Sequence, residues 1–318
     1  MRVCLMVEGQ ESVSWEQWVA LARACEDHGL DGLFRSDHYL SVVDRFALGS
    51  LDAWTTLAGL AAITSTLRLG TLVSPATFRH PTVLAKSVVT VDHISGGRVE
   101  LGIGAGWHEP EHVRLGFPFP PTRERIDALA EQLEIVHRSW REEPFSFDGE
   151  HFRLVDADPR PKPVQRPHPP LIVGGIARPR SAALAARWAD EYNTVFATPD
   201  ECRERRARVV EACEREGREP IRFSLMTGVL IGADRDELHE RARRLAALRG
   251  DELPGGDAAA WIAALPDAWI VGTPEEAVEQ LRALADAGVE RVMLQHLLHD
   301  DLELVALLGE QVAPALRS

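Results

Sequence analysis

Two adjacent residues, Asp37 and His38, carry the side chains that proton transfer requires. A carboxylate beside an imidazole can orient the ring and raise its pKa, which makes the histidine a proton donor or a stabiliser of developing negative charge. The pair follows an apolar run that ends at Phe34. A histidine that merely caps a loop is the structural alternative, but polar residues directly after a strand favour function. We therefore predict Asp37 and His38 as catalytic residues.

Glycine-rich turns follow two further apolar runs. Gly174 and Gly175 precede a predicted helix whose exposed backbone amides would bind phosphate, and glycine lets the backbone approach closely. Gly106 precedes Trp107 and His108, so a flat ring can approach the strand and the indole can wall it. A tryptophan packed in the core under the loop is the alternative for Trp107. The turns indicate a ligand with a flat ring and a phosphate.

Metal-assisted hydrolysis is an alternative chemistry for the histidines and carboxylates near these turns. The residues that it would use are His38, His80, His93, His108, Asp37 and Asp92. No predicted strand carries a His-x-His pair, and Asp92 and His93 fall late in a predicted helix, away from the strand ends. We therefore predict no metal. Glu109 and Glu111 are expected to face solvent or to cap the next segment.

The elements that position these residues alternate along the chain. Eight strands, each followed by a helix, are predicted at 2–7, 31–34, 67–73, 99–103, 171–173, 191–195, 221–231 and 291–294. Such alternation requires parallel strands with right-handed crossovers, and eight units close into a (β/α)8 barrel whose site lies at the carboxyl ends of the strands. A doubly wound sheet is the rival fold, but the segment after Val7 lacks its G-x-G-x-x-G turn.

One barrel domain is expected over 1–318, with two insertions. The stretch 141–170 is rich in proline, and an Asp148-Gly149 turn within it predicts a small hairpin before an extended crossing. The stretch 250–268 is punctuated by glycine and proline. A lid over the barrel mouth and a surface excursion with its own short helix are both open for it.

The composition of the chain limits the kinds of molecule that it can bind. The 318 residues carry a formal net charge of −14, which disfavours nucleic acid and anionic membranes. No apolar run reaches about 18 residues, and no charged segment leads into an apolar one at the start. The four cysteines form no C-x-x-C pair, as in reduced cytosolic proteins. We expect a cytoplasmic protein that binds a small molecule.

Five stretches, in order along almost the whole chain, resemble the luciferase-like monooxygenase superfamily and in particular its deazaflavin-dependent oxidoreductase branch. They are 34–38, 69–75, 96–107, 170–175 and 271–276. The resemblance implies a luciferase-like barrel and coenzyme F420, an 8-hydroxy-5-deazaflavin, as cofactor. It also implies that Asp37 and His38 lie near the deazaflavin ring, where the histidine assists at N1 or protonates the substrate.

The same resemblance implies the rest of the cofactor site. A cis peptide bond between Leu72 and Val73 would form a bulge behind the ring, and Gly174, Gly175 and Ile176 would bind the phosphate. The predicted cofactor-binding residues are therefore Asp37, His38, Leu72, Val73, Ser74, Gly106, Trp107, His108, Gly174, Gly175 and Ile176.

One departure concerns the substrate. Sugar-phosphate dehydrogenases of this branch carry a glutamate directly after the glycine turn, where this chain has Trp107. Their phosphate-binding lysines have no match either, since Lys86 and Lys162 are the only lysines. Glucose 6-phosphate is therefore not the expected substrate.

Three functions remain open from the sequence. The first is an oxidoreductase that moves a hydride between F420 and a small organic substrate, in either direction. The second is an FMN-dependent monooxygenase served by a separate flavin reductase. The third is a non-catalytic flavin-binding protein of the same fold, although the intact Asp37-His38 pair argues against it. Dimers are common in the resembled family, so a homodimer is expected.

Overall fold

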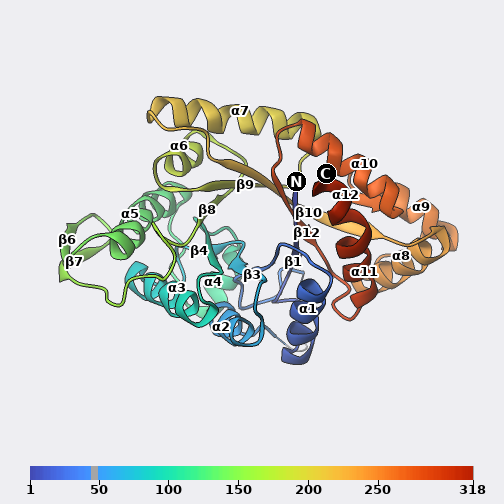
Figure 1. Ribbon diagram of the computed structural model, residues 1–318, viewed down its shortest axis with the longest axis horizontal. Coiled ribbons are helices and arrows are strands. Elements are labelled where there is room, and N and C mark those ends of the chain that lie inside the picture. Colours follow the sequence, from blue (N-terminus) through green and yellow to red (C-terminus); the bar gives the residue numbers. More distant parts are fainter. Residues whose placement is uncertain (44–48, 318) are drawn as a thin grey trace.

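Backbone pairing closes eight parallel strands into a barrel in the computed structural model, which describes residues 1–43 and 49–317 (Figure 1). The barrel strands are β1 (Arg2–Val7), β2 (Gly32–Arg35), β3 (Arg68–Thr71), β5 (Val99–Gly104), β8 (Leu171–Gly174), β9 (Glu191–Val195), β10 (Arg222–Ile231) and β12 (Arg291–Gln295). They are neighbours in that order, and β12 pairs with both β10 and β1. The predicted (β/α)8 barrel is confirmed, and the doubly wound alternative is wrong.

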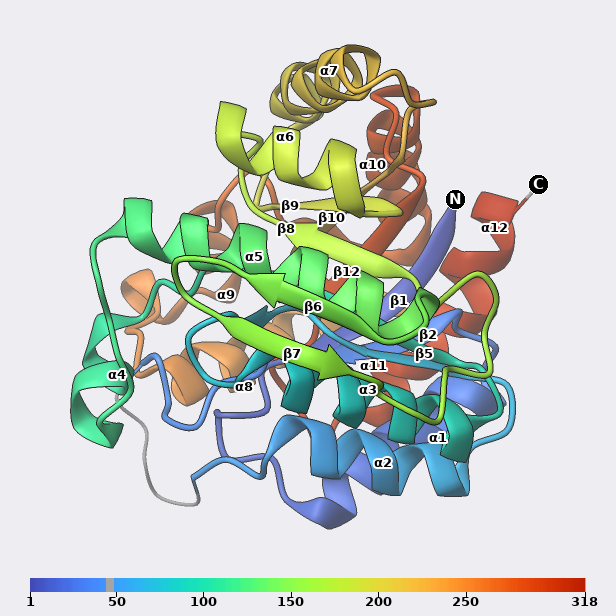
Figure 2. The same ribbon diagram turned by 90° about the vertical axis from the view of Figure 1, so that its left-hand side faces the viewer.

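Helices surround the barrel. They are α1 (Trp15–Asp27), α2 (Ala53–Ile63), α3 (Pro81–Ser95), α5 (Thr122–Arg141), α6 (Pro179–Trp188), α7 (Pro199–Arg215), α8 (Arg235–Arg249), α10 (Pro274–Asp286), α11 (Leu302–Leu307), the π-helical turn η2 (Leu308–Val312) and α12 (Ala313–Arg317). Ser14 and Thr273 form capping boxes, which fix where α1 and α10 begin. Both termini lie at the end of the barrel where β1 starts, and α4 (Glu109–Leu115) lies at the opposite end (Figure 2).

Three short elements were not predicted from the sequence. β4 (Ser74–Pro75) pairs with β5, and β11 (Ile270–Gly272) pairs with the last three residues of β10, Val229–Ile231. α4 has only seven residues. Elements this short contain too few residues for hydrophobic periodicity to reveal them.

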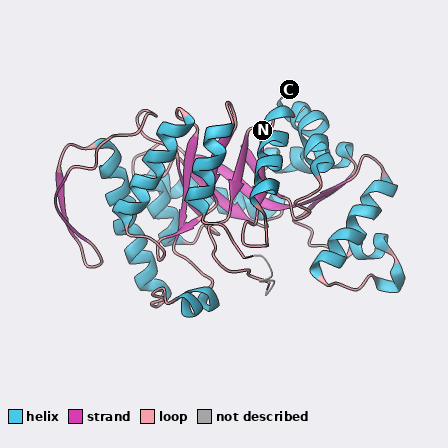
Figure 3. Cartoon of the chain, turned by 90° about the horizontal axis from the view of Figure 1, so that it is seen from below, coloured by secondary structure: helices cyan, strands magenta, loops and turns pink. Residues whose placement is uncertain are grey.

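Both predicted insertions are present. β6 (Phe145–Asp148) and β7 (Arg153–Ala157) form the expected antiparallel hairpin, which projects at one end of the molecule (Figure 1 and Figure 3). The second insertion contains a 3-10 turn, η1 (Pro254–Gly256), and the short helix α9 (Ala258–Ala263). Its apolar side chains join residues of β10 and α8 in a cluster separate from the main core.

The barrel interior is packed with side chains. Cys4, Met6, Phe34, Leu72, Ile172, Met226 and Met293 form one buried cluster inside it. Glycines on the neighbouring strands make room for this cluster, since an added Cβ at Gly70 would lie 2.6 Å from the Phe34 ring. The interior therefore supports the mouth from below.

No helix among the described residues is long and apolar enough to cross a membrane.

Candidate active site

Three predicted segments meet at the carboxyl ends of the barrel strands. They contain Asp37 and His38, Leu72 and Val73, and Gly174 and Gly175. Asp37 follows β2, and its Oδ2 accepts a 2.6 Å hydrogen bond from Ser74 Oγ, just after β3. The side chain of Val73 reaches β8, because a Cβ added to Gly174 would lie 2.9 Å from Val73 Cγ1. The peptide bond between Leu72 and Val73 is cis, as the resemblance implied. These contacts bring the three segments together, and their role as a cofactor site stays a prediction.

His38 is held by a carboxylate other than the predicted one. Its Nδ1 lies 2.7 Å from Oε2 of Glu111, which belongs to α4 and is fully buried. The other oxygen, Oε1, accepts the backbone N–H groups of Tyr39 and Leu40. The expectation that Glu111 faces solvent is wrong, because the first turn of α4 packs onto the loop after β2. Glu109 is exposed, as expected.

This contact sets the protonation of the pair. Burial lowers the pKa of the His38 imidazole, but the hydrogen bond and charge of Glu111, with the charges of Glu8 and Asp37, outweigh burial and raise it above its usual value. Burial raises the pKa of the Glu111 carboxyl, but His38 and the two backbone donors outweigh this and lower it. An imidazolium hydrogen-bonded to a carboxylate is therefore favoured.

Asp37 holds the loops together and leaves one oxygen free. Its Oδ2 also accepts a 2.5 Å bond from Arg79, which reaches Asp52 and the hydroxyl of Tyr39, each at 2.8 Å. Its Oδ1 is buried and has no partner among the residues described. An unpaired buried carboxylate oxygen is costly, so a ligand that donates a hydrogen bond here would stabilise the site.

Glycines pack around the side chain of Val73. A Cβ added to Gly104 would lie 2.8 Å from Val73 Cγ2, and one added to Gly102 would collide with the carbonyl of Thr71. Only hydrogen at these positions lets β5 and β8 approach the Leu72–Val73 segment. The apolar Leu72–Val73 segment and the unpartnered Asp37 oxygen fit a ring with a polar edge, so the residues present suit a flavin or deazaflavin.

Trp107 and His108 flank His38 on the same rim. The ring centroids lie 5.8 Å apart for His38 and Trp107, and 6.0 Å apart for His38 and His108. Trp107 is 65% exposed, so it is not a core residue and the structural alternative for it is wrong. Gly106 adopts a φ of 80°, a left-handed conformation that favours glycine and turns the chain toward α4.

The turn after β8 differs from the expected helix start. α6 begins at Pro179, four residues beyond Gly175, because the chain first makes a turn. In that turn the N–H of Gly175 donates to the carbonyl of Asn193 at 3.0 Å, and the N–H of Ala177 donates to the Tyr192 hydroxyl at 2.7 Å. Gly174 and Gly175 therefore do not open a helix, and phosphate binding there, with the exposed Ile176, stays a prediction.

An aromatic cluster fixes α4 against the mouth. Phe78 packs on Tyr39, His112 and Phe117 with ring centroids 4.7–5.4 Å apart. His112 Nε2 lies 2.6 Å from Thr77 Oγ1, which ties α4 to the loop after β4. These contacts hold Glu111 beside His38. Sequence reasoning missed this role because the two partners are 73 positions apart and no local pattern links them.

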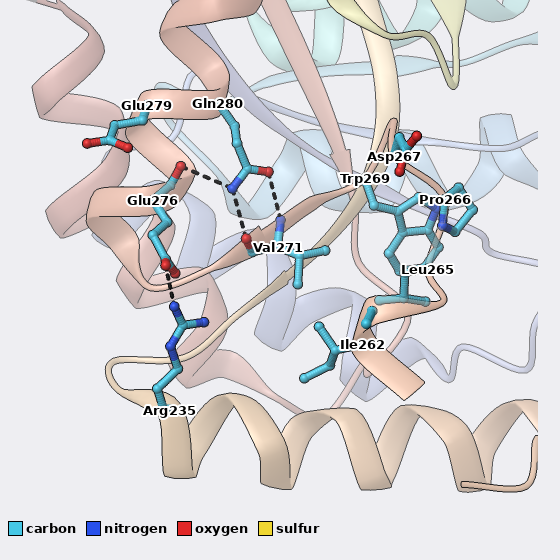
Figure 4. Close-up of a pocket in the computed structure, with 11 residues that line it drawn as sticks. Arg235, Ile262, Leu265, Pro266, Asp267, Trp269, Val271, Glu276, Glu279 and Gln280 are labelled. Carbon is cyan, nitrogen blue, oxygen red and sulfur yellow. Dashed lines mark hydrogen bonds and ion pairs between the residues drawn. The ribbon is translucent and has the colours of Figure 1, made fainter. Parts of the chain in front are cut away.

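A cavity of about 420 Å³ lies elsewhere, between α8, the loop after α9, β11 and α10 (Figure 4). Its lining includes Ile262, Leu265 and Trp269 and contains none of the predicted site residues. The charged Arg235 and Glu276 at its edge pair with each other. We place the candidate site at the barrel mouth because chemically competent groups converge there. Within 1–43 and 49–317, no cluster of three or more potential ligands that could hold a metal ion is present.

The fold and the mouth define a (β/α)8 barrel with a candidate active site at the carboxyl ends of its strands, and comparison with known proteins identifies its family. The family model described as luciferase-like monooxygenase matches residues 3–291, so the chain belongs to this family. An F420-dependent glucose-6-phosphate dehydrogenase of Nakamurella multipartita is 30% identical over 325 residues, covering 94% of this chain and 91% of that protein. An uncharacterized protein of Mycobacterium tuberculosis is 36% identical over 190 residues, which are 55% of this chain and only 66% of that protein.

Solved structures share the whole fold. An F420-dependent secondary alcohol dehydrogenase in complex with an F420-acetone adduct superposes with a TM-score of 0.82 at 20% identity, covering 100% of this chain and 99% of that chain. The oxygenating component of a type II Baeyer-Villiger monooxygenase of Pseudomonas putida, in complex with FMN, has a TM-score of 0.77 at 20% identity, covering 99% and 98%. These structures confirm the predicted luciferase-like barrel.

Proposed function

We propose that this protein is an F420-dependent oxidoreductase that transfers a hydride between the deazaflavin and a small organic substrate. The observation that carries the proposal is the His38–Glu111 pair, whose loop is joined through the Asp37–Ser74 hydrogen bond to the glycine-lined Leu72–Val73 segment. An ionisable imidazole near this apolar segment suits a redox ring whose charge changes during the reaction. The F420-dependent relative that matches nearly the whole chain supports the choice of cofactor.

The residues of the mouth would have separate roles in binding the ring and in moving a proton. Leu72 and Val73 would lie behind the ring, and Trp107 would lie at its edge. When bound, the deazaflavin supplies the hydride chemistry. Glu111 occupies Nδ1 of His38, which leaves Nε2 to stabilise negative charge or to pass a proton.

The turn after β8, with Gly174, Gly175 and Ile176, would bind the cofactor phosphate. Ser74, Gly106 and His108 would complete the cofactor site. Glucose 6-phosphate is not proposed as substrate, because Trp107 stands where the sugar-phosphate dehydrogenases of this branch have glutamate.

FMN is the alternative cofactor, in a monooxygenase that would need a flavin reductase as partner. The FMN-containing neighbour of the same fold supports this alternative. Titration of the apoprotein with F420 and with FMN, followed by fluorescence, decides between them. Tight binding of F420 and weak binding of FMN is the expected result, and the reverse would overturn the choice of F420.

We also propose a cytoplasmic homodimer with a small-molecule substrate. The apolar side chains of Ile63, Val83 and Ile94 are exposed on the packed pair α2 and α3, which supports burial of this face against a second copy. Light scattering of the purified protein measures the oligomeric state. A mass of one chain at micromolar concentration would contradict the dimer.

A further inference from the structure

A carboxylate that the sequence analysis passed over lies at the inner edge of the barrel mouth. Glu8 directly follows β1, whose Cys4 and Met6 point into the barrel interior. Its Oε1 accepts a 2.6 Å hydrogen bond from Nε2 of Gln295, at the end of the neighbouring strand β12. Since Gln295 is in register with Met6, this contact places the Glu8 carboxylate above the packed interior.

Neutral amides hold Glu8 in place. Its Oε2 accepts a 2.9 Å hydrogen bond from Nε2 of Gln10, whose own oxygen accepts from Ser36 Oγ. Gln10 is fully buried and Gln295 is 8% exposed, so surrounding side chains pack against both anchors. Each carboxylate oxygen accepts one amide bond, and a carboxylate can accept about four hydrogen bonds. Glu8 is half-buried, so acceptor capacity remains toward the open side.

Glu8 accepts hydrogen bonds from two amides and forms no ion pair within the part of the chain that the structure describes. Other carboxylates of the mouth have charged partners: Asp37 and Asp52 pair with Arg79, and Glu111 pairs with His38. Glu11, in the same loop as Glu8, uses both oxygens on Ser41 and the backbone of Val42. The charge of Glu8 also contributes to raising the pKa of His38, so the two groups are within electrostatic reach. The mouth therefore combines the His38 imidazole with a carboxylate, Glu8, that neutral amides anchor and no ion pair holds.

We propose that Glu8 is the specificity-determining carboxylate of the substrate site and accepts a hydrogen bond from a hydroxyl or ammonium group of the substrate. The substrate is then a neutral alcohol or an amine, because an anionic group beside Glu8 would be repelled. This inference rests on the proposed function, since it assumes that the substrate lies in the same mouth as the cofactor. It assigns a chemical class to the substrate that the family alone does not give.

Three probes of one shape test the proposal: cyclohexylamine, cyclohexanol and cyclohexanecarboxylate. Their binding to the F420 complex is measured by the fluorescence of the bound deazaflavin. The wild-type protein is expected to bind the ammonium most tightly, then the alcohol, then the carboxylate. Glu8→Gln keeps the shape and removes the charge, so it should weaken ammonium binding about tenfold or more and improve carboxylate binding.

Two further variants make the test specific. Glu109→Gln removes one negative charge from an exposed position near the same rim and should keep the wild-type order, which excludes an effect of overall charge. Glu8→Asp keeps the charge and should keep the order even if Glu8→Gln fails to fold. Equal affinities of the wild type for all three probes, or an unchanged ammonium preference in folded Glu8→Gln, would overturn the role of Glu8.

Failure of the proposed function gives a different result. If F420 does not bind the wild-type protein, the choice of cofactor is wrong. Calorimetric titration of the apoprotein with the same three probes then decides the role of Glu8 separately. The same order of affinities supports the role, and equal affinities overturn it.

Discussion

Carboxylates lie at both ends of the barrel interior, but their hydrogen-bond partners differ between the two ends. At the amino end, Arg291 is 1% exposed and bonds to both Glu100 and Glu191 with Nη2–Oε2 distances of 2.7 Å. At the carboxyl end, Glu8 has only neutral partners and one oxygen of Asp37 has none among the described residues. Buried charges that pair with one another leave a penalty when one partner is removed, whereas carboxylate oxygens without a charged partner at a mouth can accept a hydrogen bond from a ligand.

At the amino end, each buried carboxylate pairs with guanidinium groups of the same cluster. Burial lowers the pKa of the Arg291 guanidinium, but the charges of Glu100 and Glu191 outweigh burial and raise it. Arg68 adds a second cation to Glu100, and Arg222 adds one to Glu191 at 3.2 Å. Both carboxylates of this cluster are 1% exposed and paired with guanidinium groups, so the loss of Arg291 should affect stability and not chemistry.

The largest expected effect is therefore at the amino end. Arg291→Met leaves two buried carboxylates without their shared cation, which should lower the free energy of unfolding by about 3–5 kcal/mol. Urea denaturation measures this loss, and F420 affinity of the folded fraction should stay unchanged. A loss of F420 affinity without a loss of stability would show that the two ends are not separate in function.

The next effect is at the carboxyl end. His38→Ala removes the proposed proton-transfer group and should lower turnover on the order of 100-fold while F420 still binds. The matched control is His151→Ala, which removes an exposed imidazole on the hairpin and should keep wild-type turnover. Wild-type turnover of His38→Ala with intact binding would refute the catalytic role of His38.

A smaller effect is expected where Gly174 packs against Val73. Gly174→Ala places a methyl group 2.9 Å from Val73 Cγ1, and this overpacking should cost about 1–3 kcal/mol and weaken F420 binding. Combining it with Val73→Ala should restore part of the stability, because the colliding methyl groups are removed. Thermal denaturation of the two single variants and the double variant measures the coupling, and strictly additive losses would contradict the contact.

The smallest effect concerns pH. Glu111→Gln keeps the shape of the contact but removes its charge, so the pKa of His38 should fall below that of the wild type. NMR titration of the His38 ring measures the change. A raised pKa stabilises the folded state at low pH, and this contribution is lost as pH rises through the folded-state pKa. The variant should lack that contribution, and an unchanged His38 pKa would show that Glu111 does not set it.

Much of the fold was predictable because it depends on local patterns. The alternation of strands and helices, with caps at Ser14 and Thr273, follows from periodicity and capping chemistry. β4, β11 and α4 were missed because they are too short to show a period. The resemblance added the cis bond between Leu72 and Val73, which no local rule predicts for a pair without proline.

The sequence by itself determined which strand ends carry polar residues, and so it located Asp37 and His38. Only the tertiary structure decided which groups meet there. Glu111 lies 73 positions from His38, and Gln295 lies 287 positions from Glu8. Closure of the barrel brings such distant strand ends together, and side-chain packing then selects the partners. Local propensity fixes the elements, but hydrogen bonds between distant elements fix the chemistry of the mouth.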